Sequence, residues 1–285
     1  MLISVIIPLY KDWDRLLLCL EALKIQTADF LDFEVIIVNN DPYDEMHLEN
    51  NYPFMTKFTS QSISGSYAAR NKGLKLASGN GLLFTDSDCI PRENWIQTAI
   101  SLLNTSSGDL IAGQIKLFSD LDNRYVRFDT ALGFPNENYV KKHNFGVTAN
   151  LLVRKSVFDD VGEFDPKLLT GGDAEFCHRA VKAGWLIEYR KELIVSHPAR
   201  SSWFQLKNKS VRFGGRLPSA SNSVLKTLKL VGKFRIRIDD VSQIYNLKTK
   251  SISQRVEIFL LKQQLRWVEA CESVRVAMGK KPGRT

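Results

Sequence analysis

The sequence predicts an α/β fold in which a mostly parallel sheet is flanked by helices. Three short apolar runs support this expectation, and they are Leu2–Leu9, Phe33–Val38 and Gly81–Thr85. The runs are rich in β-branched and aliphatic residues at both odd and even positions. This pattern is typical of strands in a parallel sheet that is covered on both faces. A polar cluster follows each run, and ligands of open α/β sheets bind beyond the carboxyl ends of the strands. The three clusters should therefore converge on one crevice.

Charge divides the chain into two parts. Residues 200–285 hold 19 Lys and Arg against 5 Asp and Glu, a net charge of +14. Residues 1–199 hold 20 against 26, a net charge of −6. We therefore expect an α/β domain over residues 1–200 and a basic, mostly helical extension over residues 201–285.

The first half of the chain should alternate strands and helices. A helix over Arg15–Gln26 follows from leucines that recur at helical spacing. Residues 42–58 lack a clear pattern and suggest a loop with a short strand near Phe54–Phe58. Ser66–Ala77 is a second expected helix, preceded by a Ser-Gly pair. A proline suited to the first helical turn opens a third, at about Glu93–Leu103.

The second half should complete the sheet. Its apolar runs predict strands at Leu110–Phe118, Thr148–Val153 and Ile187–Val195, the last ending before His197. Ser156–Val161 is expected to be a short helix, and two glycines open another at Asp173–Ala183. Ser119–Asn144 has mixed polarity and a Gly-Phe-Pro sequence, so we expect a long loop or flap there.

Composition favours a globular protein, with 44% apolar and 25% charged residues in a chain of 285. No uncharged apolar stretch reaches the roughly 18–20 residues that a membrane-spanning helix needs. The N-terminus enters a strand directly, without a signal segment. The four cysteines are widely spaced and form no CxxC pair, so we expect reduced thiols in a cytoplasmic protein.

Two acidic residues follow the third apolar run. Asp86 and Asp88 alternate in an extended turn, so both carboxylates can face the same side. Paired hard oxygens suit Mg²⁺ or Mn²⁺ carrying phosphate oxygens, and a solvated turn is the alternative. His197 follows a strand, where it could be a further ligand for Mn²⁺ or a structural histidine.

A second acidic cluster follows the two glycines. Asp173 lies in the first turn of the expected helix, where it could cap the helix or act as a general base. Glu175 points elsewhere on the helix and is the weaker candidate. Arg70, on the expected helix Ser66–Ala77, could bind a carboxylate or phosphate with two hydrogen bonds or form a surface ion pair.

With these residues in place, the chain resembles inverting, family-2-type glycosyltransferases of the GT-A fold, over about residues 3–200. The segments that carry the resemblance, in the family's order, are SVIIPLY (4–10), EVIIVNND (34–41), GSYAARNKGLKLASG (65–79), LLFTDSDCIP (82–91) and TANLLVRKSVFDDVGEFDPKLLTGGDAEFCHRAVKAGW (148–185). Five motifs in this order are much more specific than any one alone.

The resemblance implies a nucleotide-diphosphate sugar as the donor, with UDP-sugars favoured. Donor-binding positions of the family match Pro8, Tyr10, Asn40, Arg70 and Asp86. The family commonly has Asp where this chain has Asn at positions 39 and 40. An amide can still hydrogen-bond a pyrimidine edge, so this departure affects the identity of the base.

The resemblance also implies a metal site and a catalytic base. Asp88, with Asp86 nearby, would hold Mn²⁺ or Mg²⁺, with His197 as the third candidate ligand. Asp173 matches the base that takes the acceptor proton in a single, inverting displacement. The family's motif is often Glu-Asp, whereas Gly172 precedes the aspartate here, so one carboxylate occupies that point.

Residues 251–278 predict a long amphipathic helix with two apolar stripes. The first contains Ile252, Val256, Phe259, Leu260, Trp267, Ala270, Val274 and Ala277, and the second Ile258, Leu261, Leu265, Val268 and Val276. One stripe can pack on the body of the protein. The other needs a partner, which would be another subunit in a homo-oligomer, the preceding helix or a membrane surface.

The basic extension favours an anionic membrane surface over nucleic acid. Val224–Ile238 mixes apolar and basic residues, which suits the headgroup zone of an anionic bilayer. A docked helical hairpin with a solvated basic face is the alternative. Basic charge without a recognisable nucleic-acid module argues against a nucleic-acid partner.

We therefore expect a metal-dependent glycosyltransferase of the hexosyltransferase type, acting on a glycan or lipid-linked acceptor, as in polysaccharide biosynthesis. It would be cytoplasmic and peripheral on the inner membrane through residues 222–285. The alternatives are a non-catalytic sugar-nucleotide-binding or scaffolding protein at a membrane surface, and a sugar-phosphate nucleotidyltransferase. Asp86, Asp88 and Asp173 argue against the first. Residues 10–13, Tyr-Lys-Asp-Trp, replace the Gly-rich, Arg-containing loop that the second requires.

Overall fold

The computed structural model describes residues 2–41, 43–44, 51–216, 232–247 and 250–283. Close contacts divide the chain into two compact units. The first comprises Met1–Leu117 and Phe134–Pro198, and the second comprises Phe118–Gly133 and Ala199–Thr285. The four cysteines are free.

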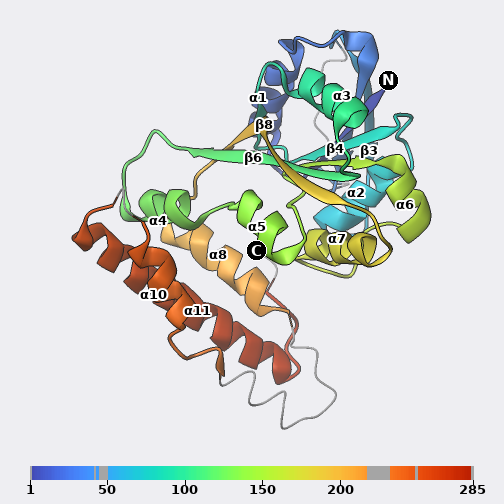
Figure 1. Cartoon of the computed structure of the whole chain (residues 1–285). Helices are drawn as coiled ribbons and strands as arrows, with labels where there is room; N and C mark the ends of the chain where they lie inside the picture. Colours follow the sequence, from blue (N-terminus) through green and yellow to red (C-terminus); the bar gives the residue numbers. More distant parts are fainter. Residues whose placement is uncertain (1, 42, 45–50, 217–231, 248–249, 284–285) are drawn as a thin grey trace. The chain divides into compact units, whose positions relative to one another are not determined.

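The first unit is built on a mixed sheet of eight described strands, in the order β3-β2-β1-β4-β7-β6-β8-β5 (Figure 1). The strands are β1 (Ile3–Leu9), β2 (Phe33–Asn39), β3 (Met55–Ser60), β4 (Gly81–Thr85), β5 (Ile90–Pro91), β6 (Leu110–Phe118), β7 (Asn150–Arg154) and β8 (Ile187–Pro198). β1, β2, β3 and β4 run parallel. β7 is antiparallel to β4 and β6, and β5 is antiparallel to β8. The α/β fold class is confirmed. Antiparallel strands continue the sheet beyond its four parallel strands.

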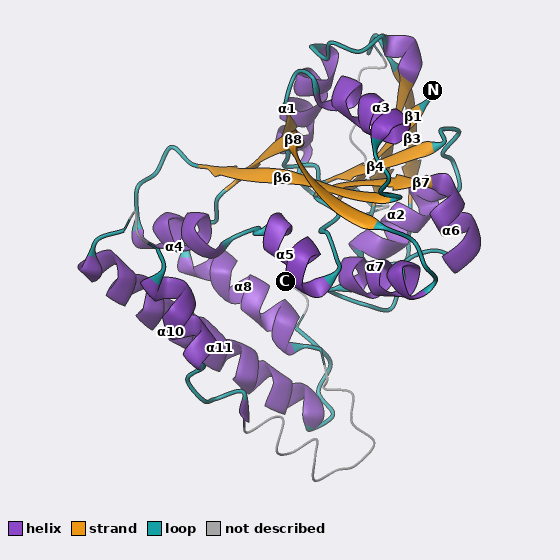
Figure 2. Cartoon of the chain, viewed as in Figure 1, coloured by secondary structure: helices purple, strands orange, loops and turns teal. Residues whose placement is uncertain are grey.

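Helices cover both faces of this sheet (Figure 2). They are α1 (Trp13–Lys24), α2 (Ser66–Leu74), α3 (Trp95–Thr105), α5 (Asn136–His143), α6 (Lys155–Val161) and α7 (Gly172–Lys182). Because successive strand residues point to opposite faces, the apolar runs serve two cores. Ile3 and Val5 belong to the core that contains α1 and α3 side chains. Ile6 belongs to the core that contains α2, α6 and α7 side chains, including Phe176.

The expectation of a long loop over Ser119–Asn144 is wrong, because this segment contains two helices, α4 (Arg124–Leu132) and α5. Asn123 caps α4, and its side-chain oxygen accepts hydrogen bonds from the backbone N–H groups of Tyr125 and Val126 at 2.9 and 3.0 Å. At least one of the polar residues that obscured the helical pattern, Asn123, therefore has a structural role as a helix cap. The last strand also extends further than expected, since β8 continues through His197 to Pro198.

The described helices of the second unit are α4, α8 (Trp203–Gly214), α10 (Ile238–Tyr245) and α11 (Ile252–Ala277). α11 begins with a capping box, in which Ser251 and Gln254 each bond the other's backbone N–H. Leu261 and Leu265 of α11 form a small core with Leu206 of α8. None of the described helices combines the length and the apolar character needed to cross a membrane.

Of the two apolar stripes expected on α11, the second supplies most of the buried apolar residues, namely Ile258, Leu261, Leu265 and Val276, and the first supplies Ala270. Most of the first stripe's large side chains are exposed, namely Ile252, Val256, Leu260 and Trp267. Between α8 and α11 lies an open groove of about 700 Å³, lined by residues that include Trp203, Val211 and Trp267. The segment Val224–Ile238, expected to contact a membrane, lies mostly outside the described residues.

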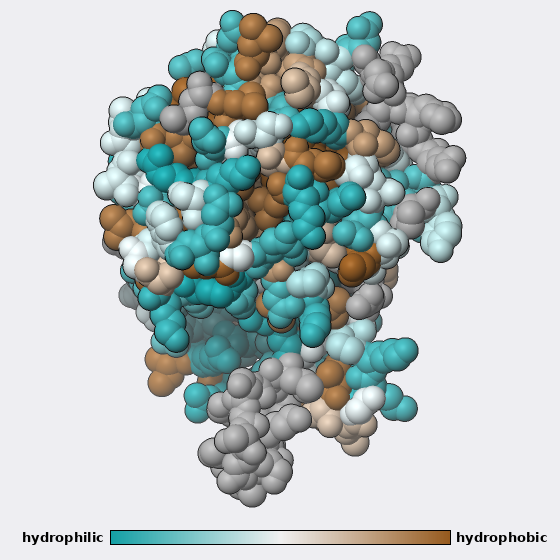
Figure 3. All heavy atoms as spheres, turned by 90° about the vertical axis from the view of Figure 1, so that its right-hand side faces the viewer, coloured by the Kyte–Doolittle hydropathy of each residue, from teal (hydrophilic) through white to brown (hydrophobic). Residues whose placement is uncertain are grey.

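The face of the molecule drawn in Figure 3 mixes hydrophilic residues with separate apolar spots. No broad continuous apolar surface is visible among the described residues on that face.

Candidate functional site

Polar residues follow the parallel strands β1, β2 and β4 at their carboxyl ends. Tyr10 follows β1 and is 59% exposed. Pro8 lies within β1. The β2 end carries two asparagines, and Asp86 and Asp88 come directly after β4. Parallel strands place these ends at one edge of the sheet, as the sequence indicated.

Asp86, Asp88 and His197 form an acidic and imidazole cluster at this edge. Each offers one ligand atom, and the three atoms lie within 4.8 Å of one another. The pairing of β5 with β8 explains the convergence, because it joins Ile90, two residues after Asp88, to Ser196, beside His197. The sequence pattern predicted that the last strand ends at Val195, so it missed the continuation of β8 through His197.

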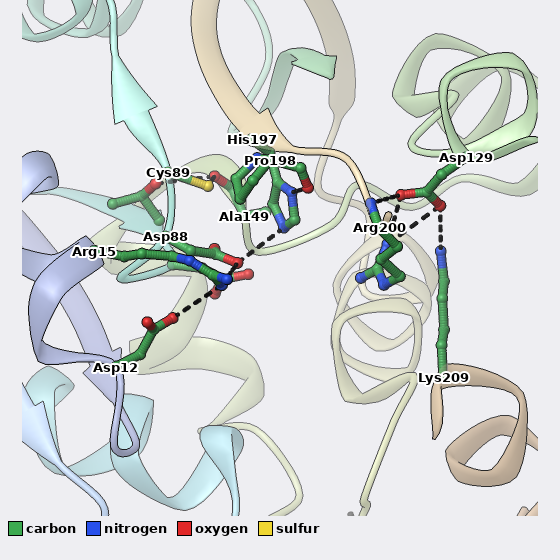
Figure 4. A network of polar contacts seen from close by, with 12 residues as sticks. Asp12, Arg15, Asp88, Cys89, Asp129, Ala149, His197, Pro198, Arg200 and Lys209 are labelled. Atoms are coloured by element: carbon green, nitrogen blue, oxygen red, sulfur yellow. Dashed lines mark hydrogen bonds and ion pairs between the residues drawn. The ribbon is translucent and has the colours of Figure 1, made fainter. Parts of the chain in front are cut away.

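The imidazole of His197 has its two nitrogens in different environments. Nδ1 lies 2.7 Å from the backbone oxygen of Pro198, and since a carbonyl oxygen only accepts, Nδ1 carries a proton. Nε2 lies 3.5 Å from Oδ2 of Asp88 (Figure 4). In the neutral ring, Nε2 therefore presents a lone pair toward the carboxylate. Two carboxylates and one imidazole nitrogen form a donor set that fits a divalent cation, Mn²⁺ better than Mg²⁺.

Two arginines adjoin the cluster. Arg70 of α2 is 3% exposed and forms an ion pair with Asp86. Arg15 of α1 lies 3.8 Å from Asp88 and 3.4 Å from Asp12. Burial raises the pKa of Asp88, and the charge of Arg15 opposes that increase. Sequence reasoning missed Arg15, although its place in the first turn after β1 was a usable signal.

Asp173 lies in the first turn of α7, and the residue that precedes this helix, Gly171, has a left-handed backbone conformation. Gly171 has φ of +74° and ψ of 14°, a conformation that strongly favours glycine. Asp173 does not cap the helix; Oδ1 accepts hydrogen bonds from its neighbour Ala174 N–H at 3.0 Å and from the Tyr67 hydroxyl at 3.3 Å. Burial raises the pKa of the Asp173 carboxyl, while Arg70 and the hydrogen bonds act in the opposite direction.

Glu175 is engaged elsewhere on α7. Both of its oxygens pair with the guanidinium of Arg179, at 3.0 and 3.1 Å. The same arginine binds the backbone oxygen of Glu163 at 2.8 Å. Asp173 is therefore the better placed of the two acids to accept a proton.

The two asparagines after β2 organise the surrounding loops. The amide of Asn39 donates to the backbone oxygens of Asp41 and Asp44, both at 2.8 Å. The amide of Asn40 donates to the carbonyls of Gln61 and Ile63 at 2.9 and 2.8 Å, and its oxygen accepts from Gly65 N–H at 2.6 Å. Both amide protons of Asn40 are thus used within the protein.

The comparisons with known proteins agree on one family. A family model described as glycosyl transferase family 2 matches residues 4–162. Among curated proteins, the chain is 33% identical over 219 residues to glycosyltransferase AglE of Haloferax volcanii, covering 74% of this chain and 71% of AglE. It is 26% identical over 243 residues to pre-mycofactocin glycosyltransferase of Mycobacterium tuberculosis, covering 80% of this chain but only half of that protein.

Solved structures agree in fold. The S. aureus TarS fragment 1–349 in complex with UDP aligns with a TM-score of 0.56 and 15% identity, over 98% of this chain and 92% of that one. Mannosyltransferase PcManGT from Pyrobaculum calidifontis, in complex with GDP-Man and Mn²⁺, aligns with a TM-score of 0.55 and 12% identity, over 99% of this chain and 76% of that one. At these identities the likeness shows the fold alone, and it is the GT-A fold expected from the sequence.

Proposed function

Since this chain belongs to glycosyl transferase family 2 and is an enzyme of the glycosyltransferase type, we propose that it is an inverting, metal-dependent transferase that moves a sugar from a nucleotide-diphosphate donor, a UDP-sugar by preference, to an acceptor hydroxyl. The observation that carries the proposal is the convergence of Asp86, Asp88 and His197 beside the ends of the parallel strands. The non-catalytic alternative is not favoured, because the relatives are named glycosyltransferases.

Donor binding is assigned to the ends of the first strands and to α2. Pro8 and Tyr10 would line the nucleotide, and exposed Tyr10 offers a ring for stacking on the base. Asn40 would act by fixing the loop at Gln61–Gly65, since its amide protons are already used there. Arg70 and Asp86 would lie near the diphosphate.

Asp88, Asp86 and His197 would hold the cation. A divalent ion bound there would offset the negative charge that develops on the nucleoside-diphosphate leaving group. The lone pair of His197 Nε2 beside the Asp88 carboxylate supports this assignment, because a cation would satisfy both atoms. Arg15 and Arg70 add positive charge at the same edge.

Asp173 would be the general base. The acceptor hydroxyl forms a new bond to the anomeric carbon as the bond from that carbon to the diphosphate oxygen breaks. The hydroxyl proton moves to the Asp173 carboxylate, and the nucleoside diphosphate departs with the bonding electrons. Attack from the opposite face inverts the anomeric configuration, and no covalent enzyme intermediate is required.

The two parts of the chain would have different roles in the reaction. We propose that residues 1–200 bind the nucleotide sugar and catalyse transfer, and every residue assigned above lies in the first unit. Residues 201–285 would serve the acceptor side, which we take to be a glycan or lipid-linked glycan at an anionic membrane surface. The net charge of +14 after residue 199 and the exposed apolar stripe of α11 support that role.

A donor screen tests the proposal. The stability of the full chain would be measured by thermal shift with UDP-, GDP- and dTDP-sugars, each with and without Mn²⁺, because a ligand of the native state raises apparent stability. We expect the largest increase with a UDP-sugar plus Mn²⁺. No shift with any of the nucleotide sugars would contradict donor binding, and slow release of free sugar from the preferred donor would exclude a purely binding role.

A further inference from the structure

The hydroxyl of Tyr67 donates a hydrogen bond to Oδ1 of Asp173 at 3.3 Å. The two residues lie on different elements, α2 and α7, and are far apart in the sequence. Tyr67 is 6% exposed, whereas Asp173 retains part of its surface. The buried phenol therefore approaches the carboxylate from the protein side and leaves the other side of Asp173 accessible.

Close packing fixes the position of the Tyr67 ring. A Cβ atom at Gly172 would lie 2.8 Å from ring atom Cε2, so no larger residue fits there without displacing the ring. On another side, the ring of Phe164 packs with its centroid 5.7 Å away. The absence of a side chain at the residue before Asp173 thus makes room for the ring that reaches the carboxylate.

The same helix also reaches the acidic cluster. Arg70 is three residues after Tyr67, so the two side chains lie on neighbouring positions of one helical face. Its guanidinium lies 5.7 Å from the centroid of the Tyr67 ring and pairs with Asp86. α2 therefore contacts the proposed base through Tyr67 and the candidate cation ligands through Arg70.

We propose that Tyr67 is a positioning residue for the general base, whose hydrogen bond orients the Asp173 carboxylate and favours its ionised form. This inference rests on the proposed function, because it assumes that Asp173 accepts the acceptor proton. Burial raises the pKa of the Tyr67 phenol, so the hydroxyl stays protonated and acts as a donor throughout. The proton taken from the acceptor goes to Asp173, and Tyr67 never exchanges one.

The other charged and titratable groups around Asp173 do not compete for this role. Arg70 of α2 remains a cation across the working range. Burial raises the pKa values of the Tyr139 phenol of α5 and the Cys177 thiol of α7, so both stay neutral. Removing the Tyr67 hydroxyl therefore changes one hydrogen bond to the carboxylate and leaves the surrounding charges as they are.

Tyr67→Phe in the full-length protein tests the inference. Loss of a hydrogen bond to a charged group should lower kcat by about tenfold and leave the KM for the donor unchanged. The acidic limb of the pH profile of kcat should move to higher pH, because the ionised carboxylate loses a donor. Gly172→Ala keeps the hydroxyl but crowds the ring, and it should move the limb in the same direction.

Tyr139→Phe is the matched control. Burial first, and then the charge of Asp173, raise the pKa of that phenol, yet its hydroxyl is not among the hydrogen-bond partners of Asp173 in the described chain. The acidic limb of the pH profile of kcat in Tyr139→Phe should stay at the wild-type position. A wild-type kcat and pH profile in Tyr67→Phe and Gly172→Ala, alongside an inactive Asp173→Asn, would overturn the positioning role. An active Asp173→Asn would instead overturn the assigned base, and with it the inference.

Discussion

The Nε2 atom of His197 faces Oδ2 of Asp88 across 3.5 Å, while Nδ1 of the same ring binds the backbone oxygen of Pro198. The backbone bond determines which nitrogen can act as a ligand. It leaves the Nε2 lone pair directed at a carboxylate, an arrangement that is repulsive unless a proton or a metal ion lies between them.

Asp88→Ala should abolish the effect of Mn²⁺ on donor binding, and Asp86→Ala should weaken it. Asp88 faces the imidazole, whereas Asp86 also pairs with Arg70 and so shares its charge with a cation of the protein. Calorimetric titration of UDP with and without Mn²⁺ measures the effect. Glu175→Ala, which removes an acid paired with Arg179 on α7, serves as the control. A metal effect of wild-type size in Asp88→Ala would rule out the assigned ligand.

Asp173→Asn should keep donor binding and lose transfer by about 10²–10⁴-fold, because an amide cannot accept the acceptor proton. Transfer would be measured at saturating donor and acceptor, and donor affinity by calorimetry. Near-wild-type turnover in this variant would show that another group is the base, with Glu175 the next candidate.

The same substitution should not destabilise the protein at neutral pH. Burial raises the pKa of Asp173 above its ordinary 3.8, so the folded state holds this proton more tightly than the unfolded state. Wild-type stability should then fall as pH rises from the ordinary pKa through the raised one, and remain lower above it. Asp173→Asn lacks that loss and should be at least as stable as the wild type at pH 7. Urea midpoints on both sides of that window provide the comparison, and a large loss of stability in the variant at pH 7 would contradict the argument.

Activity should show the same raised pKa. The base must be ionised to accept a proton, so kcat should increase with pH through an acidic limb above the ordinary pKa of Asp173. The pH dependence of kcat at saturating substrates measures the limb. A limb at or below pH 3.8 would contradict this prediction, because the pKa of the base would then not be raised above its ordinary value.

The exposed stripe of α11 should contribute to binding of anionic membranes. Deleting residues 222–285 would test the basic extension, but it would also remove Leu261 and Leu265, which pack on Leu206. The double substitution of Leu260 and Trp267 by Ser leaves that core intact.

Both side chains are more than half exposed, and each would bury apolar surface worth up to roughly 1.5–3 kcal/mol in a bilayer interface. Co-sedimentation with phosphatidylserine-containing liposomes should therefore fall about tenfold or more. It should also fall at high salt, where the Debye length shrinks to about 3 Å. Leu18→Ser, on α1 and 57% exposed, is the matched control. Equal sedimentation of the wild type and the double variant would argue against this surface.

Much of the site follows from local sequence patterns, because strand ends and short acidic motifs are local features. Asp86, Asp88 and Asp173 were predicted as site residues in this way, and these assignments remain predictions. The contacts that depend on packing between distant elements were not. The extension of β8 through His197 and the reach of Tyr67 to Asp173 are set by neighbours far along the chain.

The error over Ser119–Asn144 has a similar physical cause. Asp129, on α4, is 1% exposed and is bound by Arg200. The backbone N–H of Arg200 donates a hydrogen bond to the Asp129 carboxylate at 2.9 Å, and the guanidinium of Arg200 lies 3.2 Å from the same carboxylate (Figure 4). Lys209 of α8 adds a second cationic contact at 3.9 Å. A charged residue on the inner face of a short helix disrupts the apolar period that sequence reasoning depends on. No local pattern reveals that its partner lies on another segment.

The pairing of β5 with β8 has a consequence for how the enzyme is made. β8 is the last strand of the sheet, so a ribosome exposes Asp86 and Asp88 long before the segment that carries His197. Until then the growing chain presents two carboxylates without the imidazole, and it also lacks Asp173. Non-local pairing of this kind forms late in folding. We therefore expect a nascent chain of this protein to acquire its nucleotide-facing sheet first, and its competence to bind a cation and transfer a sugar only after the segment that carries His197 has been synthesised.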